Sequence, residues 1–234
     1  MNFTKTRSLP KLLCALLLLA LSNTPAPSQT KNSTPEDITT ARELLTSLGY
    51  WLNVEAFGFD ASLRHALIAF QKIEGRQRTG KLTKTELSAL QAAHKPTPVE
   101  SGDQHIEVDL QRQVLFIVES NGEVSHILPV SSGSGQLYTQ DGVTHQAVTP
   151  LGRFKIQRKI LGWRKSPLGL LYYPNYIHGG VAIHGNPAVP VFPASHGCIR
   201  IPMFASQEFS AIAIVGMAVL VHDGTGSIPG HAQN

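Results

Sequence analysis

The sequence predicts an α+β protein of more than one domain, in which a small three-helix bundle precedes a mainly antiparallel β domain. Apolar residues recur at the 3.6-residue spacing of helices between residues 34 and 93, and from about residue 104 the spacing changes to the two-residue period of strands. No regular alternation of strands with helices follows, which argues against a parallel sheet. At 234 residues the chain has room for one or two domains.

The composition excludes several classes of protein. With 42% hydrophobic residues and a formal net charge of +4, the chain is too apolar and too balanced in charge to be disordered. Two cysteines cannot make a disulfide-rich scaffold. Charged residues make up 15%, well below the usual ~25%, and no block of Lys and Arg indicates a nucleic-acid-binding surface.

Residues 1–22 are typical of an export signal peptide. Three basic residues precede ten apolar residues, 12–21, which are too few to span a bilayer, and small residues at 20 and 22 suit a cleavage site. Without this segment, which holds no acidic residue, the formal charge falls from +4 to +1. We therefore expect an exported protein of the periplasm or cell wall, with no transmembrane span in the mature chain. The alternatives are a lipid attached to Cys14 and a retained N-terminal anchor.

The rest of the chain divides into five segments. We expect a flexible leader over 23–33, a helical domain over 34–93, a linker over 94–103, a β domain over 104–223 and a tail over 224–234. Thr34 is suited to cap the first helix, which Gly49 ends, and Asp60 caps the second. The third helix opens with a capping box from Thr83 to Glu86.

The helical segment carries a recurring set of residues: Leu48, Gly49, Tyr50, Ala66, Phe70, Gln71, Gly80, Thr83 and Leu90. On these residues it resembles the peptidoglycan-binding-domain-like module that accompanies many cell-wall enzymes. The stretch between Tyr50 and Leu63 departs from the module's usual acidic loop. The resemblance implies binding to the glycan of the wall, and the alternative is a helical spacer that binds no ligand.

Strand patterns fill the C-terminal half of the chain. Two apolar segments flank Asn121-Gly122, which predicts a hairpin with a type I′ turn. Further strands are expected in the segments GRFKIQ, GVAIHG and MAVLVHD, with one helix over about 203–213.

The segment SHGC holds the residues with the clearest chemistry. His196 lies two residues before Cys198, the only cysteine after the signal, so in an extended stretch the imidazole and the thiol would share a face. A histidine can remove the thiol proton and return it to a leaving amine. Gly197 between them would let a backbone N–H approach an oxyanion. The pattern thus suggests acyl transfer by a Cys–His pair. A buried Cys–His pair without chemistry, an intermolecular disulfide, and a zinc site at His184, His196 and Cys198 are the alternatives.

Three motifs of the β domain belong together: a His-Gly pair at 184–185, Ser-His-Gly-Cys at 195–198 and TPLGRF at 149–154. With this signature the domain resembles the L,D-transpeptidases of the YkuD/ErfK type over about 104–223. Ten residues separate His184 from Ser195, fewer than in many members, and Arg200 stands where some members have Asn. The resemblance implies an L,D-transpeptidase-like β-sandwich that needs neither cofactor nor metal.

The resemblance also implies roles for individual residues. They are Cys198 as nucleophile, His196 as general base, Gly197 and Ser195 around the oxyanion hole, and His184, Gly185 and Arg200 in substrate binding. The thiol would attack the bond between an L-centre and D-Ala in a peptidoglycan stem tetrapeptide, release D-Ala and pass the acyl group to an amine. The alternatives are an L,D-carboxypeptidase that uses water, a wall-binding protein with an inactive fold, and a cysteine hydrolase of another wall-lytic family, although those place Cys before His.

Overall fold

The structure, a computed structural model, describes Met1 and residues 33–224. The described residues from Ser33 onward belong to one compact unit. The expected signal peptide, nearly all of the leader and most of the tail lie outside the described residues, so these expectations stay predictions. No helix in the described part of the chain is long and apolar enough to cross a membrane.

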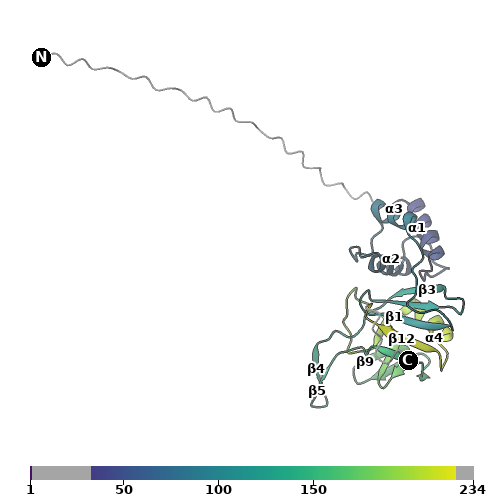
Figure 1. Ribbon diagram of the computed structural model, residues 1–234, viewed down its shortest axis with the longest axis vertical. Coiled ribbons are helices and arrows are strands. Elements are labelled where there is room, and N and C mark those ends of the chain that lie inside the picture. The colour runs from purple at the N-terminus through teal and green to yellow at the C-terminus, as the bar shows by residue number, and fades with distance from the viewer. Residues whose placement is uncertain (2–32, 225–234) are drawn as a thin grey trace, which may run out of the picture. The chain divides into compact units, whose positions relative to one another are not determined.

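Three helices come first in the described chain (Figure 1). They are α1 (Pro35–Ser47), α2 (Ala61–Ile73) and α3 (Lys84–Ala92). The predicted caps on α1 and α2 are confirmed, because side-chain oxygens of Thr34 and Asp60 accept backbone N–H groups of the first turn. Thr83 likewise caps α3. The other half of the predicted capping box is wrong, since the Glu86 carboxylate pairs with Arg76 Nε at 3.1 Å instead.

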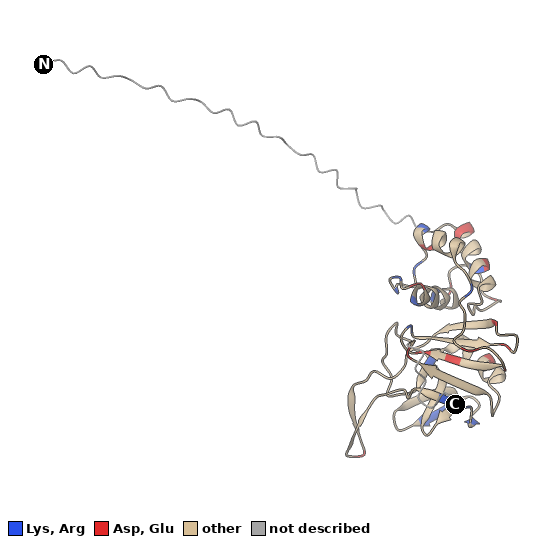
Figure 2. Ribbon diagram, in the orientation of Figure 1, with Lys and Arg blue, Asp and Glu red and all other residues tan. Residues whose placement is uncertain are grey.

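Charges of both signs are interspersed along the helices (Figure 2). Lys84 Nζ lies 2.7 Å from Asp37 Oδ1, and Arg42 Nη1 lies 2.8 Å from Asp60 Oδ1. Such surface pairs contribute only about 0–1 kcal/mol each. The packing of the helices therefore depends on apolar contacts.

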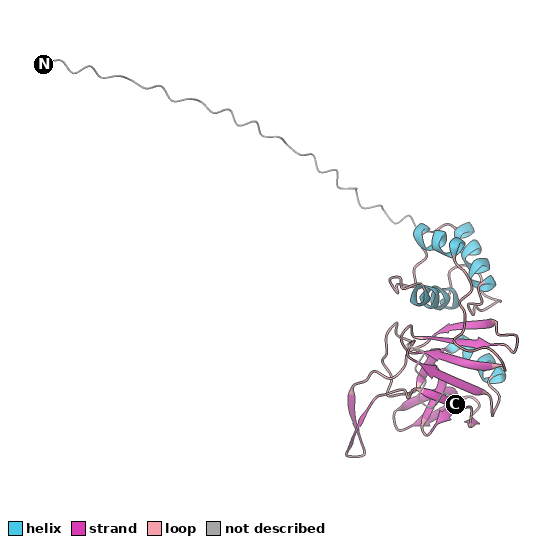
Figure 3. Cartoon of the chain, in the orientation of Figure 1, coloured by secondary structure: helices cyan, strands magenta, loops and turns pink. Residues whose placement is uncertain are grey.

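Two sheets and a hairpin follow the helices (Figure 3). The first sheet has the order β3 (Val124–Pro129), β2 (Val114–Val118), β1 (His105–Asp109), β12 (Ala218–His222), β6 (Gly152–Lys155). The second has the order β11 (Ile199–Pro202), β10 (Val181–Asn186), β9 (Gly169–His178), β7 (Arg158–Lys159), and β8 (Trp163–Ser166) also pairs with β9. The separate hairpin is β4 (Leu137–Gln140) with β5 (Val143–Gln146), and α4 spans Met203–Ile212. Only β1–β12 and β10–β11 pair in parallel among these strands, so the predicted α+β, mainly antiparallel fold is confirmed.

The turn between β2 and β3 differs from the predicted type I′ turn. Gly122 N–H donates to Glu119 O, and Glu119 N–H donates to Glu123 O, so the loop is longer than two residues. Gly122 has a φ of 81°, whereas Asn121 is not among the residues with positive φ. A type I′ turn requires positive φ at both central residues, so this loop is closer to a type I turn followed by a glycine bulge.

Strand β2 is buried on both faces. Leu115 and Ile117 join the core between the two sheets and α4. Phe116 and its alternate neighbours join a second core with the three helices. This two-sided burial explains why the segment QVLFIV lacks polar alternation.

The helical segment and its linker are attached to the first sheet by backbone hydrogen bonds. Trp51 N–H donates to Ile127 O, and Ile127 N–H donates to Gly49 O, so the chain after α1 pairs with β3. In the linker, the backbone N–H groups of Val99 and Glu100 both donate to the buried Glu107 carboxylate on β1. Helices, linker and sheet thus form a continuous structure.

Candidate active site

Ser195 folds the SHGC segment into a tight turn. Its hydroxyl accepts the Gly197 N–H at 3.0 Å and donates to Cys198 O at 2.5 Å. Its own backbone N–H donates to Ser132 O at 2.9 Å. The stretch is therefore not extended, and the expectation that His196 and Cys198 share a strand face is wrong because the serine side chain competes with a strand ladder for the backbone.

Gly197 is required by this turn. Its φ is 129°, and a Cβ atom there would lie 2.9 Å from Val148 O. Its carbonyl oxygen accepts a hydrogen bond from Thr149 Oγ1 at 2.8 Å. Thr149 is the first residue of the TPLGRF segment, and its Oγ1 also accepts the Gly133 N–H. The Thr149 hydroxyl therefore links the turn at Gly197 to Gly133.

Cys198 is a partly buried free thiol just before β11. Its Sγ lies 3.6 Å from Gly180 O, and the side chain packs beside Leu171, Tyr176 and Ala182. Burial raises the pKa of the thiol, while the Ala182 backbone N–H and the Arg200 charge act in the opposite direction. The resting thiol is therefore protonated at neutral pH and needs a base before it can act as a nucleophile.

His184 lies on β10, on the same face as Ala182. Its ring is buried, and Nδ1 lies 2.9 Å from Gly185 O. Because a carbonyl oxygen only accepts, Nδ1 carries the proton and Nε2 keeps its lone pair. Burial lowers the pKa of His184 to about 4, with the Arg200 charge contributing, although the bond to Gly185 O opposes the shift. The imidazole is thus neutral at pH 7.

His196 has a different environment. Its side chain is exposed, and its ring packs against Tyr138 with ring centroids 4.7 Å apart. Neither ring nitrogen has a hydrogen-bond partner among the residues that the structure describes. The structure therefore brings His196 to the site without an orienting partner for its imidazole.

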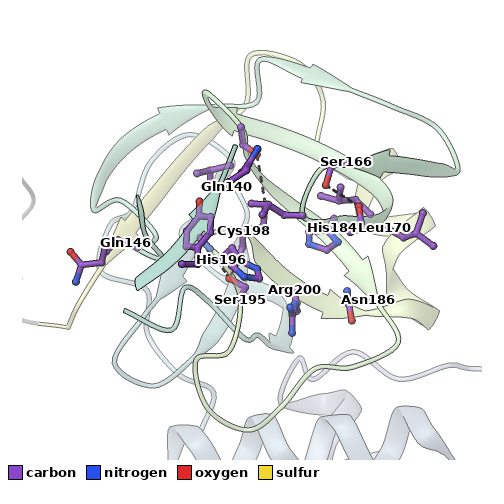
Figure 4. Close-up of a pocket in the computed structure, with 18 residues that line it drawn as sticks. Gln140, Gln146, Ser166, Leu170, His184, Asn186, Ser195, His196, Cys198 and Arg200 are labelled. Atoms are coloured by element: carbon purple, nitrogen blue, oxygen red, sulfur yellow. Dashed lines mark hydrogen bonds between the residues drawn. The ribbon is translucent and has the colours of Figure 1, made fainter. Parts of the chain in front are cut away.

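A cavity of about 380 Å³ opens in front of Cys198 (Figure 4). Besides Cys198 it is lined by the expected residues His184, Ser195, His196, Gly197 and Arg200. One wall comes from the β4–β5 hairpin through Tyr138, Gln140 and Gln146, and another from the β8–β9 hairpin around Leu168 and Leu170. These walls were not predicted, because β4, β5 and β8 are largely exposed and neither hairpin carries a clear apolar period.

Gly185 does not line this cavity. Residues of a strand alternate in direction, so Gly185 faces α4, where an added Cβ would lie 2.2 Å from Ser206 Oγ. The part in substrate binding that the resemblance implies for Gly185 therefore stays a prediction. Gly185 acts on the site through its carbonyl oxygen, which orients His184.

The backbone N–H groups near Cys198 are not all free to donate. The Gly197 N–H is already bonded to Ser195 Oγ, so it is not free for an oxyanion. The N–H groups of His196 and Cys198 donate no hydrogen bond to any described residue, and they are available donors beside the thiol. As for zinc, no group of three or more metal-ligating side chains in residues 33–224 is arranged to hold a metal ion.

Comparisons with known proteins agree with this fold. The profile of the YkuD family, the L,D-transpeptidase catalytic domain, matches residues 103–221. The solved L,D-transpeptidase (residues 123–326) from Xylanimonas cellulosilytica is 35% identical, with a TM-score of 0.76, over 85% of this chain and 100% of that one. That coverage exceeds the profile match, so the likeness includes part of the helical segment. The L,D-transpeptidase (Yku) structure from Stackebrandtia nassauensis is 23% identical, with a TM-score of 0.48, over 88% of this chain and 100% of that one. A search of the curated proteins finds no match.

The fold and the comparisons define the class of this protein as an enzyme domain of the L,D-transpeptidase type. This chain belongs to the YkuD family of L,D-transpeptidase catalytic domains.

Proposed function

We propose that this protein is an exported peptidoglycan L,D-transpeptidase that uses Cys198 as its nucleophile. The observation that carries the proposal is the partly buried thiol of Cys198, which opens on a cavity shared with a neutral, oriented His184. Peptidoglycan as the substrate follows from the family and from the signal peptide expected over residues 1–22.

The reaction proceeds in two acyl transfers. The sulfur attacks the carbonyl carbon between the L-centre and D-Ala of a stem tetrapeptide, and the thiol proton passes to the base. The base then protonates the amine of D-Ala as the C–N bond breaks, which leaves a thioester. An acceptor amine attacks the thioester, gives its proton to the base, and the returning proton restores the thiol.

We assign the role of base to His184, in place of the His196 expected from the sequence. His184 is neutral, has a free Nε2 lone pair and is oriented by Gly185 O, whereas the exposed His196 ring has no such partner. The backbone N–H groups of His196 and Cys198 would stabilise the oxyanion. The Arg200 guanidinium lines the same cavity and would bind a substrate carboxylate.

The experiment uses purified protein lacking residues 1–22 and the variants Cys198→Ala, His184→Ala and His196→Ala. D-Ala release from a stem tetrapeptide and product mass are followed by mass spectrometry, with and without an acceptor stem. We expect no release by Cys198→Ala, a loss of at least about 10²-fold in His184→Ala, and a change within a few-fold in His196→Ala. A large loss confined to His196→Ala would return the role of base to His196.

The same experiment separates the alternatives. Release of D-Ala without a cross-linked product, even with acceptor present, would identify an L,D-carboxypeptidase. No release by the parent protein would indicate an inactive fold that binds the wall. Equal release by parent and Cys198→Ala would contradict the thiol mechanism.

A further inference from the structure

Lys72 is an unusual residue for the interior of a helical bundle. It is 2% exposed on α2, and its Nζ donates to two backbone carbonyls, Gln113 O at 2.9 Å and Val130 O at 2.8 Å. Burial of an amine costs several kcal/mol unless its hydrogen bonds are satisfied, so a lysine here serves these two carbonyls. Burial lowers the pKa of Lys72 to about 7. Both protonation states still supply two N–H donors.

The two carbonyls belong to a hydrogen-bonded network that links Gln113 to residues 130–132. Gln113 is also buried, and its side chain accepts the Ser132 N–H at 2.9 Å and donates to Ser132 Oγ at 2.7 Å. Val130 N–H donates to Gln113 O. Residues 130–132, directly after β3, are thus fixed from the side of the helices.

Residues 130–132 are also hydrogen-bonded to the residues of the candidate active site. Ser132 O accepts the N–H groups of both Ala194 and Ser195 at 2.9 Å. Ser131 exchanges two backbone hydrogen bonds with Arg200. Since Ser195 in turn fixes the positions of Gly197 and Cys198, the contacts are continuous from Lys72 to the thiol.

A second contact joins the helical segment to the loop 187–198, which connects β10 to β11 and ends in the SHGC segment. Arg78, between α2 and α3, donates from Nη1 to Val191 O at 2.9 Å. Val191 lies in the stretch between His184 and Ser195. The neighbouring Phe192 O accepts from Ser131 Oγ at 2.8 Å.

We propose that Lys72 and Arg78 are positioning residues for acyl transfer: they hold the segment 130–132 and the loop 187–198 in the geometry that presents Cys198 to substrate. The helical segment is then a part of the catalytic unit, whether or not it also binds the wall. This proposal rests on the proposed function, but its test includes a readout that needs no substrate.

The test uses Lys72→Met and Arg78→Met in protein lacking residues 1–22, with Lys81→Met as the matched control. Lys81 belongs to the same segment, and it is exposed. Displacing a catalytic group by about 1 Å can cost up to ~10²-fold in rate. We expect kcat for D-Ala release to fall about 10-fold in Lys72→Met and a few-fold in Arg78→Met, with KM within about two-fold and with Lys81→Met like the parent.

Alkylation of Cys198 by iodoacetamide is the independent readout. A loosened loop exposes the partly buried thiol further, so we expect faster alkylation in Lys72→Met and Arg78→Met, below the thermal unfolding range of each variant. Gln113→Ala should act through the same network, so the variant Lys72→Met/Gln113→Ala should lose no more activity than Gln113→Ala alone.

The outcomes separate the two proposals. If the parent releases no D-Ala, the proposed function fails, and the alkylation rates still decide whether Lys72 and Arg78 position the thiol. If Lys72→Met does not fold, Arg78→Met at its partly exposed site decides. Parent-like kcat and alkylation in both variants, or multiplying losses in the double variant, would overturn the inference.

Discussion

At the scale of single residues, burial favours the neutral form of both Cys198 and His184. It raises the pKa of the thiol and lowers the pKa of the imidazole, so both groups rest in their neutral forms. A neutral thiol reacts slowly with chance electrophiles and oxidants. Such a resting state suits a nucleophile in an oxidising compartment, where a permanent thiolate would be consumed.

The acid side of the pH–rate profile should reflect His184. The base must be neutral, and the pKa of His184 is about 4, so kcat/KM should hold on the acid side until the pH falls towards 4 and then decline. The profile is measured for the parent and for His196→Ala, with circular dichroism at each pH to confirm folding. The limb should persist in His196→Ala. A limb near the ordinary histidine value of about 6.5 would contradict the assignment of His184 as base.

The sequence pointed to Cys198 more clearly than to the residues around it. Cys198 was singled out as the one cysteine after the expected signal, a property that is local in sequence, and the structure places it at the cavity. The orientation of His184 depends on the register of β10 against β11, with His184 opposite Arg200, and on the carbonyl of Gly185. Neither can be derived from spacing, so the sequence favoured His196, which is nearer to Cys198 along the chain.

At the scale of elements, caps and apolar periodicity predicted the helices and strands whose positions depend on the local sequence. Helices α1, α2 and α3 begin at polar caps, whereas α4 begins after Pro202 without a side-chain cap, and the strands with apolar runs form where expected. The hairpin β4–β5 was missed, because its eight strand residues are exposed or half-buried and lack an alternating apolar pattern. Its position is fixed by contacts at the site, such as that of Tyr138 with His196, which no local pattern encodes.

The packing of β10 against α4 depends on Gly185. In Gly185→Ala the new methyl group would lie 2.2 Å from Ser206 Oγ and 2.8 Å from Ser206 Cβ, so β10 and α4 must separate. We expect the free energy of unfolding to fall by about 1–3 kcal/mol, as for other overpacked cores, together with a loss of kcat because His184 lies on the same strand. Urea unfolding and D-Ala release measure the two effects. Gly180→Ala serves as the stability control, because nothing lies within 4 Å of its added Cβ.

At the scale of the whole molecule, the helices and the sheet share a core. The face of the first sheet that meets the helices carries five fully buried apolar side chains: Val114, Phe116, Val118, Val124 and Ile127. The helices and the sheet are also joined by the backbone pairing at Trp51 and by the buried Lys72. We therefore expect these two parts of the compact unit to unfold together. The proposed domain boundaries over 34–93 and 104–223 describe the order of elements along the chain, while stability belongs to both parts together.

Cooperative unfolding tests this dependence. The test uses protein that lacks residues 1–22 and carries Trp163→Phe, so that Trp51 is its one tryptophan. Helix content from far-ultraviolet circular dichroism and the fluorescence of Trp51, which is buried in the core between the sheets, should give one coincident urea transition. Removing residues 1–93 exposes the five apolar side chains, each worth about 1.5–3 kcal/mol of burial, which together approach the 5–15 kcal/mol that stabilises a typical domain. We therefore expect the fragment from residue 94 to be unfolded or aggregated at 25 °C. A monomeric fragment with its own sharp transition and D-Ala release like the parent would show that the sheet domain is independent and would also argue against positioning by the helices.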